Sequence, residues 1–294
     1  MKTKSKIWIG VGAFVVAGSG AIASGASLPA DARPISSRAT NAPFDRTVTP
    51  RTPLSGFVVA QHARHGGEGG EGEGGEKGGA KLPPDLDFAL KIALIRGHLL
   101  IGDELVREGQ WAAAMPHFLH PAEELYGGIR RQLKDYKVPP FQAALKSLSN
   151  TVKAKKGGED YARALKAVQD ALANADTGLK AKQTAWPAFV TETAVEVLKT
   201  ATDEYEEAIV KGRIAKPVEY QDARGFILQA EQMIESAAAD LEKKDADALK
   251  QVRADIAELK KAFPAAMPPK TPVKDHGAVL GDVSRIELHA GKLM

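Results

Sequence analysis

The chain has 294 residues, of which 44% are hydrophobic and 26% are charged, enough to bury a core in one large domain or two small ones. Its formal net charge of +3 equals the contribution of Lys2, Lys4 and Lys6, because residues 1–26 hold no Asp, Glu or Arg. The remainder is therefore neutral, which argues against a nucleic-acid partner. The chain has no cysteine, so a lipoprotein anchor, disulfides, thiolate metal sites and cysteine-based catalysis are excluded.

The N-terminus has the pattern of an export signal. Three lysines precede an apolar run at 7–23, and the small-residue sequences AIA and SGA follow, ending at Ala23 and Ala26. We interpret residues 1–26 as a signal peptide that directs the protein to the periplasm or out of the cell. Because the run is close to the length that spans a bilayer, a single uncleaved N-terminal anchor is the alternative, and it would be the chain's contact with a membrane.

Residues 27–82 are predicted to be a disordered linker. The first part is rich in Pro, Ser, Thr and Arg, and residues 65–81 form a Gly/Glu tract that cannot bury a core. His62 and His65 precede the glutamates of this tract, which could collect cations weakly; the alternative is a solvated spacer.

From Pro83 onward the apolar residues follow helical spacing. Starts at Pro84, Pro187 and Pro217 and breaks at Gly109 and 157–158 predict about seven helices over 83–266. No segment alternates in the manner of strands, so the fold class is all-α, an antiparallel helix bundle with short connections. Residues 267–294 form a C-terminal tail whose structure the pattern leaves open, with Ile286 and Leu288 as docking candidates.

The first two predicted helices carry a histidine cluster. With a turn at Gly109–Gln110, residues equally far from the turn face each other, so His98 comes level with His117 and His120. Glu123 and Glu124 follow at helical spacing from His120, and Asp103 or Glu104 could lie nearby. Histidine with carboxylate is a ligand set for copper, iron or zinc, so His98, His117, His120, Glu123 and Glu124 are the candidate metal ligands.

Two structural explanations compete with a metal site. If a helix begins at Pro121, Glu123 and Glu124 merely interact favourably with its positive end. Residues 101–118 also resemble one unit of a tetratricopeptide repeat, with Gly102 and Ala114 allowing close helix contact, but no second copy follows. Either explanation leaves a well-packed hairpin without an ion. In the metal interpretation, Pro116 and Pro121 remove backbone donors beside the histidines, a local inconsistency of the kind found at functional sites.

The segment HPAEELYGG, from His120 to Gly128, resembles the His-x-x-Glu helix of the imelysin-like proteins, in which an aromatic residue and a glycine follow. That family consists of exported all-helical bundles, some tied to periplasmic iron or copper uptake. The resemblance implies that His120 and Glu123 correspond to the family's proposed metal ligands. Phe118 stands where the family usually has glycine.

These features predict an exported, non-enzymatic helical bundle that binds a transition metal ion. A periplasmic interaction or scaffolding bundle without metal is the alternative. No nucleophile elbow, phosphate loop, zinc-protease motif or dinucleotide fingerprint is present. Binding of haem, with histidine or Met115 as axial ligand, is a further hypothesis. The chain has no Cys-x-x-Cys-His motif for covalent attachment of haem.

Overall fold

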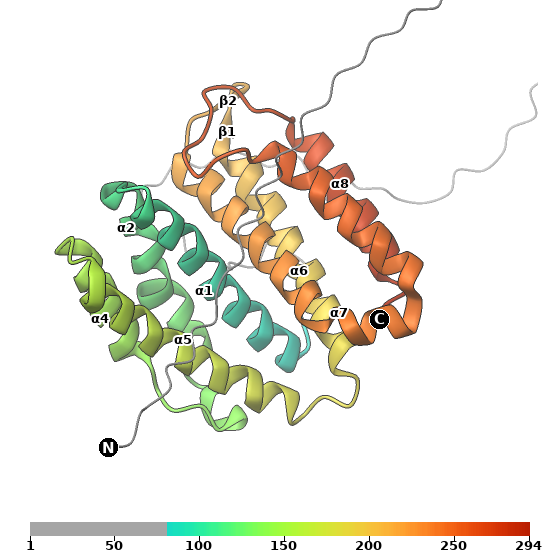
Figure 1. Ribbon diagram of the computed structural model, residues 1–294, viewed down its shortest axis with the longest axis horizontal. Coiled ribbons are helices and arrows are strands. Elements are labelled where there is room, and N and C mark those ends of the chain that lie inside the picture. Colours follow the sequence, from blue (N-terminus) through green and yellow to red (C-terminus); the bar gives the residue numbers. More distant parts are fainter. Residues whose placement is uncertain (1–80) are drawn as a thin grey trace, which may run out of the picture. The chain divides into compact units, whose positions relative to one another are not determined.

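The computed structural model describes residues 81–294 (Figure 1). The predicted signal or anchor at 1–26 and the linker at 27–82, with His62 and His65, lie outside the described residues except for the last two linker positions. The elements in chain order are α1 (Pro84–Arg107), α2 (Trp111–His120), the π-helix η1 (Pro121–Leu125), α3 (Tyr126–Ile129), the 3₁₀-helix η2 (Leu133–Tyr136), α4 (Gln142–Lys153), α5 (Gly158–Lys180), α6 (Trp186–Ala208), β1 (Ile209–Val210), β2 (Arg213–Ile214), α7 (Pro217–Leu259), η3 (Lys260–Ala262) and α8 (His276–Ala290).

The all-α fold class is confirmed for the described part of the chain. Seven of its α-helices have ten residues or more, and the strands are limited to a two-residue antiparallel ribbon that pairs Ile209 with Ile214. The hairpin of α1 and α2 lies between α4 and α5 on one side and α6, α7 and α8 on the other (Figure 1). Helix α1 is central, since more than half of its residues are buried. No helix between residues 81 and 294 combines the length and apolarity that crossing a bilayer requires.

Helix α7 is two helical segments joined at Asp245. The backbone there is extended (φ −157°, ψ 95°), and the Asp245 carboxylate accepts a hydrogen bond of 2.9 Å from the amide of Ala248. Asp245 therefore caps the second segment in the usual manner of an N-terminal aspartate. This break separates the two helices that the apolar spacing predicts around Ile234 and Val252.

The C-terminal residues form a helix that belongs to the bundle. Helix α8 packs on α6 and α7 and buries Ile286, whereas Leu288 points outward and is 69% exposed. Asp275 caps the helix by accepting a hydrogen bond of 2.7 Å from the Ala278 amide. The helical body thus continues well beyond residue 266.

Helices α1 and α7 cross with their backbones in near contact at Gly97 and Gly225. A Cβ atom added to Gly225 would lie 2.4 Å from the Gly97 carbonyl oxygen, and one added to Gly97 would lie 2.5 Å from Cδ1 of Phe226. Only residues without a side chain allow this approach. The crossing brings His98, which follows Gly97 on α1, into contact with Asp222, which lies about one turn before Gly225 on α7.

A candidate metal centre at the crossing of three helices

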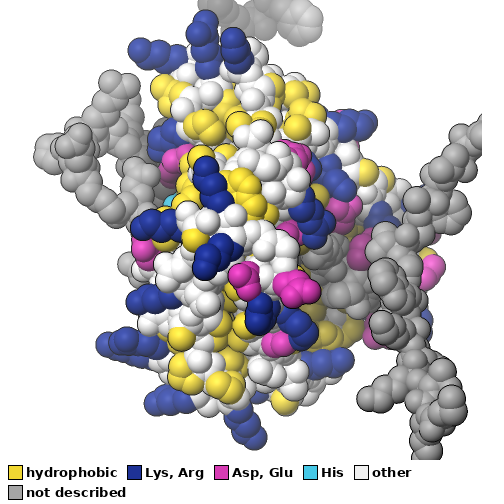
Figure 2. All heavy atoms as spheres, turned by 60° about the vertical axis from the view of Figure 1, so that its left-hand side comes forward, with side chains coloured by type: hydrophobic (Ala, Val, Ile, Leu, Met, Phe, Trp, Pro, Cys, Tyr) yellow, Lys and Arg dark blue, Asp and Glu magenta, His cyan; other side chains and the backbone are white. Residues whose placement is uncertain are grey.

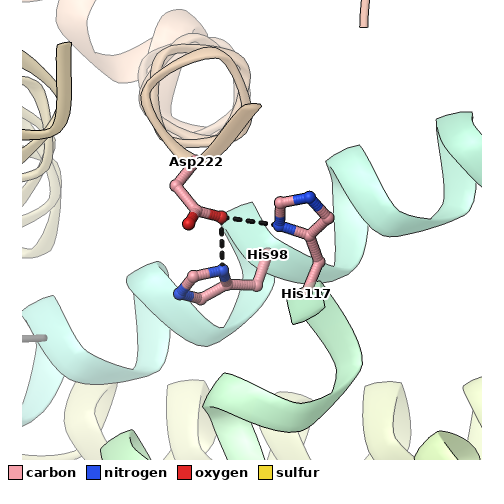
Figure 3. Close-up of side chains that lie close together, drawn as sticks. All are labelled: His98, His117 and Asp222. Atoms are coloured by element: carbon pink, nitrogen blue, oxygen red, sulfur yellow. Dashed lines mark hydrogen bonds and ion pairs between the residues drawn. The ribbon is translucent and has the colours of Figure 1, made fainter. Parts of the chain in front are cut away.

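Three buried side chains from three helices meet at one carboxylate oxygen (Figure 3). The Nδ1 atoms of His98 on α1 and of His117 on α2 each lie 2.7 Å from Oδ1 of Asp222 on α7. All three side chains are fully buried, and their potential ligand atoms lie within 4.8 Å of one another. Among residues 81–294 this is the group of histidine and carboxylate side chains that could hold a metal ion.

The fold fixes each of the three positions. A short turn between Arg107 and Trp111 folds α2 back along α1, which places His117 level with His98. Arg224, half a turn from Asp222, bonds both carboxylate oxygens of Glu104 on α1 at 2.7 and 3.2 Å and donates to the Phe263 carbonyl at 2.5 Å. Such a two-point arginine–carboxylate pair sets orientation as well as distance, so it locks α7 against α1 beside the cluster.

The Asp222 carboxylate is ionised although it is buried. Burial alone raises the pKa of this carboxyl, but the charges of His98 and His117 and the hydrogen bonds from their rings outweigh burial and hold the pKa well below its usual range. A buried carboxylate of this kind is stable only with its cationic or hydrogen-bonding partners in place.

His117 has an acceptor on each side of its ring. Its Nδ1 faces the Asp222 carboxylate, and its Nε2 lies 3.0 Å from the amide oxygen of Gln221. Gln221 is held in that orientation because its amide nitrogen donates to Sδ of Met267 at 3.7 Å. An acceptor behind the distal nitrogen is the arrangement that orients histidines bound to metals.

His120 stands at the edge of the cluster. Its Nδ1 lies 3.8 Å from Oδ2 of Asp222, its ring meets the His98 ring edge-on at 5.5 Å between centroids, and its side chain is 23% exposed. His120 is the last residue of α2, directly before the π-helical turn η1. The backbone stays helical through Pro116 and Pro121, so Pro121 begins a π-helical turn that continues α2 and does not begin a separate helix with a free N-terminus. Single π-helical turns inside α-helices often accompany functional sites.

The predicted carboxylates lie outside the group of three. Glu123 is exposed, and Glu124 is half-buried one turn after His120. Glu104 is paired with Arg224, and Asp103 accepts a hydrogen bond of 2.9 Å from the Tyr161 hydroxyl. The structure therefore brings His98, His117 and His120 together but supplies the central carboxylate from Asp222, which the sequence reasoning did not select.

The comparisons with known proteins give one finding. Residues 180–294 match the model of the iron permease-associated 4-helix bundle domain. No significant match was found among curated proteins or among solved structures. The matched part is less than half of the chain and supports a helical-bundle family associated with iron permeases; it does not single out the imelysin-like proteins.

The residues of the cluster come from both sides of the point where the match begins. Residues 180–294 contain α6, both segments of α7, and α8, and so include Asp222 and Gln221. The histidines come from α1 and α2, which lie before the matched part. The cluster therefore joins the part of the chain that matches this domain model to a helical hairpin that lies outside the match.

Proposed function

We propose that the protein is a non-catalytic metal-handling protein that binds one transition metal ion, preferentially iron, through His98, His117 and Asp222. The observation that carries the proposal is the buried group of two imidazole nitrogens and one carboxylate oxygen within 4.8 Å. Two histidines and one carboxylate are a ligand set that suits iron(II), and copper and zinc accept the same atoms. The match to an iron permease-associated domain favours iron.

The distances within the cluster are close to those that an ion requires. Ligand atoms about 2.1 Å from a metal lie roughly 3.0–3.4 Å apart in octahedral or tetrahedral geometry. The two nitrogen–oxygen distances are 2.7 Å, so the side chains need to separate by less than about 1 Å. Gln221 would keep the distal nitrogen of His117 oriented, and His120 is placed to serve as a further ligand on the exposed side.

A binding role is proposed in preference to catalysis because the cluster is enclosed. A shallow hollow of about 490 Å³ lies over α4, and a pocket of about 220 Å³ lies between α1, α5, α6 and α7; neither is lined by a residue of the cluster. An organic substrate would need such a space next to the reacting atoms.

We also propose that the protein works outside the cytoplasm, because residues 1–26 have the pattern of an export signal. N-terminal sequencing of the protein from fractionated cells would test this location.

The test is the metal content of the untagged full-length chain. Wild type is incubated anaerobically with iron(II), and separately with zinc and copper, then desalted and analysed for bound metal. The expected result is one ion per chain for wild type and for His289→Gln, which alters a histidine–aspartate pair between His289 on α8 and Asp255 on α7. The double variant His98→Gln/His117→Gln should retain less than about a tenth of the metal, since each lost ligand lowers affinity at least as much as a lost supporting contact. Equal loading of wild type and the double variant would refute the proposal, provided circular dichroism shows that both are folded.

A scaffolding role without metal is the second candidate. One observation favours it: both Nδ1 atoms already lie 2.7 Å from the Asp222 carboxylate, so ion pairing within the cluster can balance its charge without a metal. In that case neither wild type nor variant holds metal, and a pull-down from periplasm recovers the same partner proteins with wild type and with the histidine variant.

A further inference from the structure

The segment that links α3 to α5 carries an unusual excess of exposed positive charge. Between residues 130 and 156 there are eight lysines and arginines and a single acidic residue, Asp135. All eight cations are exposed: Arg130, Arg131, Lys134, Lys137, Lys146, Lys153, Lys155 and Lys156. None of them forms an ion pair with another residue in the described range of 81–294, whereas Lys243 on α7 and Lys260 on η3 are paired with acidic neighbours.

The outer face of α4 is shaped to receive anionic groups. Lys146 and Lys153 are seven residues apart and therefore project from the same side of the helix. The hollow of about 490 Å³ is lined by Lys146, Lys156 and the hydrogen-bonding side chains of Ser147, Asn150 and Thr151, together with two alanines, and contains no carboxylate. Figure 2 turns this side of the molecule forward, and Lys and Arg side chains prevail over Asp and Glu on it. We call residues 130–156 the basic segment.

We propose that the basic segment rests on an anionic phospholipid bilayer. A segment that gathers eight exposed cations, none with an ion-pair partner in the described range, is attracted to a surface of negative charge, and each lysine or arginine held near such a surface strengthens the attraction. The phosphate groups of the lipids would meet the lysines and hydroxyl groups around the α4 hollow. This inference is independent of the proposed metal site and goes beyond it.

The composition of the basic segment favours a lipid surface over a macromolecular partner. The exposed large hydrophobic side chains of the described part all lie elsewhere, from Val210 onward, so the segment offers no apolar anchor of the kind that dominates protein interfaces. It also exposes no aromatic side chain on which bases could stack, and six of its eight cations are lysines, which act as point charges. Diffuse electrostatic adsorption needs neither feature.

The test is sedimentation of the full-length chain with phosphatidylcholine vesicles that contain or lack phosphatidylglycerol. The difference between the two lipid mixtures removes the contribution of the apolar N-terminal run, and the contribution of Lys2, Lys4 and Lys6 cancels in the comparison of variants with wild type, because all of them retain these lysines. Wild type is expected to prefer the anionic vesicles, and high salt should abolish the preference. Because each lysine contributes about fivefold to partitioning, the variant Lys146→Glu/Lys153→Glu/Lys156→Glu should lose at least about a hundredfold.

The control variant Lys243→Glu/Lys244→Glu/Lys250→Glu makes the same change in net charge on exposed positions of α7 and should keep the preference. All six positions are exposed, and the Lys243–Asp240 pair is a surface pair of small energy, so melting temperatures close to that of wild type are expected for both variants and are checked first. The proposal is overturned if wild type does not prefer anionic vesicles or if both variants lose binding equally. It is also overturned if inorganic phosphate, at the concentration of lipid phosphate, releases the protein, because the segment would then be a site for a free anion.

Discussion

Replacing Asp222 by asparagine should both destabilise the metal-free protein and weaken metal binding. The substitution keeps the shape of the side chain but removes the charge that receives a hydrogen bond of 2.7 Å from His117 and forms an ion pair of 2.7 Å with His98. Hydrogen bonds to a charged group are worth about 1.5–3 kcal/mol each, and the asparagine oxygen can still accept one of them. Breaking a fully buried charged pair costs about 3–5 kcal/mol, so we expect a loss of about 3 kcal/mol. For a chain of this size that corresponds to a decrease in melting temperature of about 6–12 °C.

The loss should depend on pH in a defined direction. The pKa of Asp222 in the folded protein is lowered below the value of about 3.9 in an unfolded chain. The unfolded state therefore binds more protons in acid, and the stabilisation by the carboxylate is present above about pH 4 and declines as the pH falls further. The difference in stability between wild type and Asp222→Asn should accordingly be full at pH 7 and should shrink as the pH is lowered toward 3.

The assay is thermal unfolding by calorimetry in the presence of a chelator, at pH 7 and at a series of acidic pH values. Asp255→Asn is the matched control, because Asp255 also accepts a hydrogen bond of 2.7 Å from a histidine, His289, but at a partly exposed position. It should lower stability by no more than about 1 kcal/mol. If Asp222→Asn melts at the wild-type temperature at pH 7, or if its deficit grows in acid, the described electrostatics of the cluster are wrong.

Three further predictions follow from the surroundings of the cluster. Gly225→Ala should lower the free energy of unfolding by about 1–3 kcal/mol in chemical denaturation and should reduce metal affinity, because the added Cβ would lie 2.4 Å from the Gly97 carbonyl oxygen. The control is Gly281→Ala on α8, which should be neutral or stabilising because the atom nearest to its added Cβ is 4.0 Å away. Gln221→Leu should weaken metal binding about 10–100-fold in calorimetric titration while leaving one site per chain, and an unchanged affinity would show that the Gln221 contact to His117 has no orienting role. Metal affinity should fall between pH 7.5 and pH 5.5, since imidazole nitrogens must lose their protons to bind a metal, and an affinity independent of pH would contradict ligation by His98 and His117.

Local sequence features were sufficient to predict the helices before residue 266 and the meeting of the histidines, but not helix α8. The turn after Arg107 is only a few residues long, so the register of α1 and α2 follows from counting residues outward from it, which places His98 beside His117. The starts at Pro84, Pro187 and Pro217 fall in the first turns of α1, α6 and α7, where proline is tolerated.

The carboxylate of the cluster could not be found in the same way. Asp222 is 105 residues from His117, and its contact depends on the crossing of α1 and α7 at Gly97 and Gly225, a tertiary feature without a local period. A weak signal was present: Asp222 lies four residues before Phe226 and next to the apolar stripe of α7, where a charged side chain must be paired. The two-residue ribbon after α6 and the π-helical turn at Pro121 likewise lack a periodic signal in the sequence.

The most direct test of the metal site is X-ray absorption spectroscopy of the full-length protein loaded with one equivalent of iron(II). Ligation by His98, His117 and Asp222 predicts a first coordination shell with at least two imidazole nitrogens and a carboxylate oxygen at about 2.0–2.2 Å, and loss of the imidazole scattering in His98→Gln/His117→Gln. A shell made only of oxygen atoms, or imidazole scattering that persists in the double variant, would contradict it.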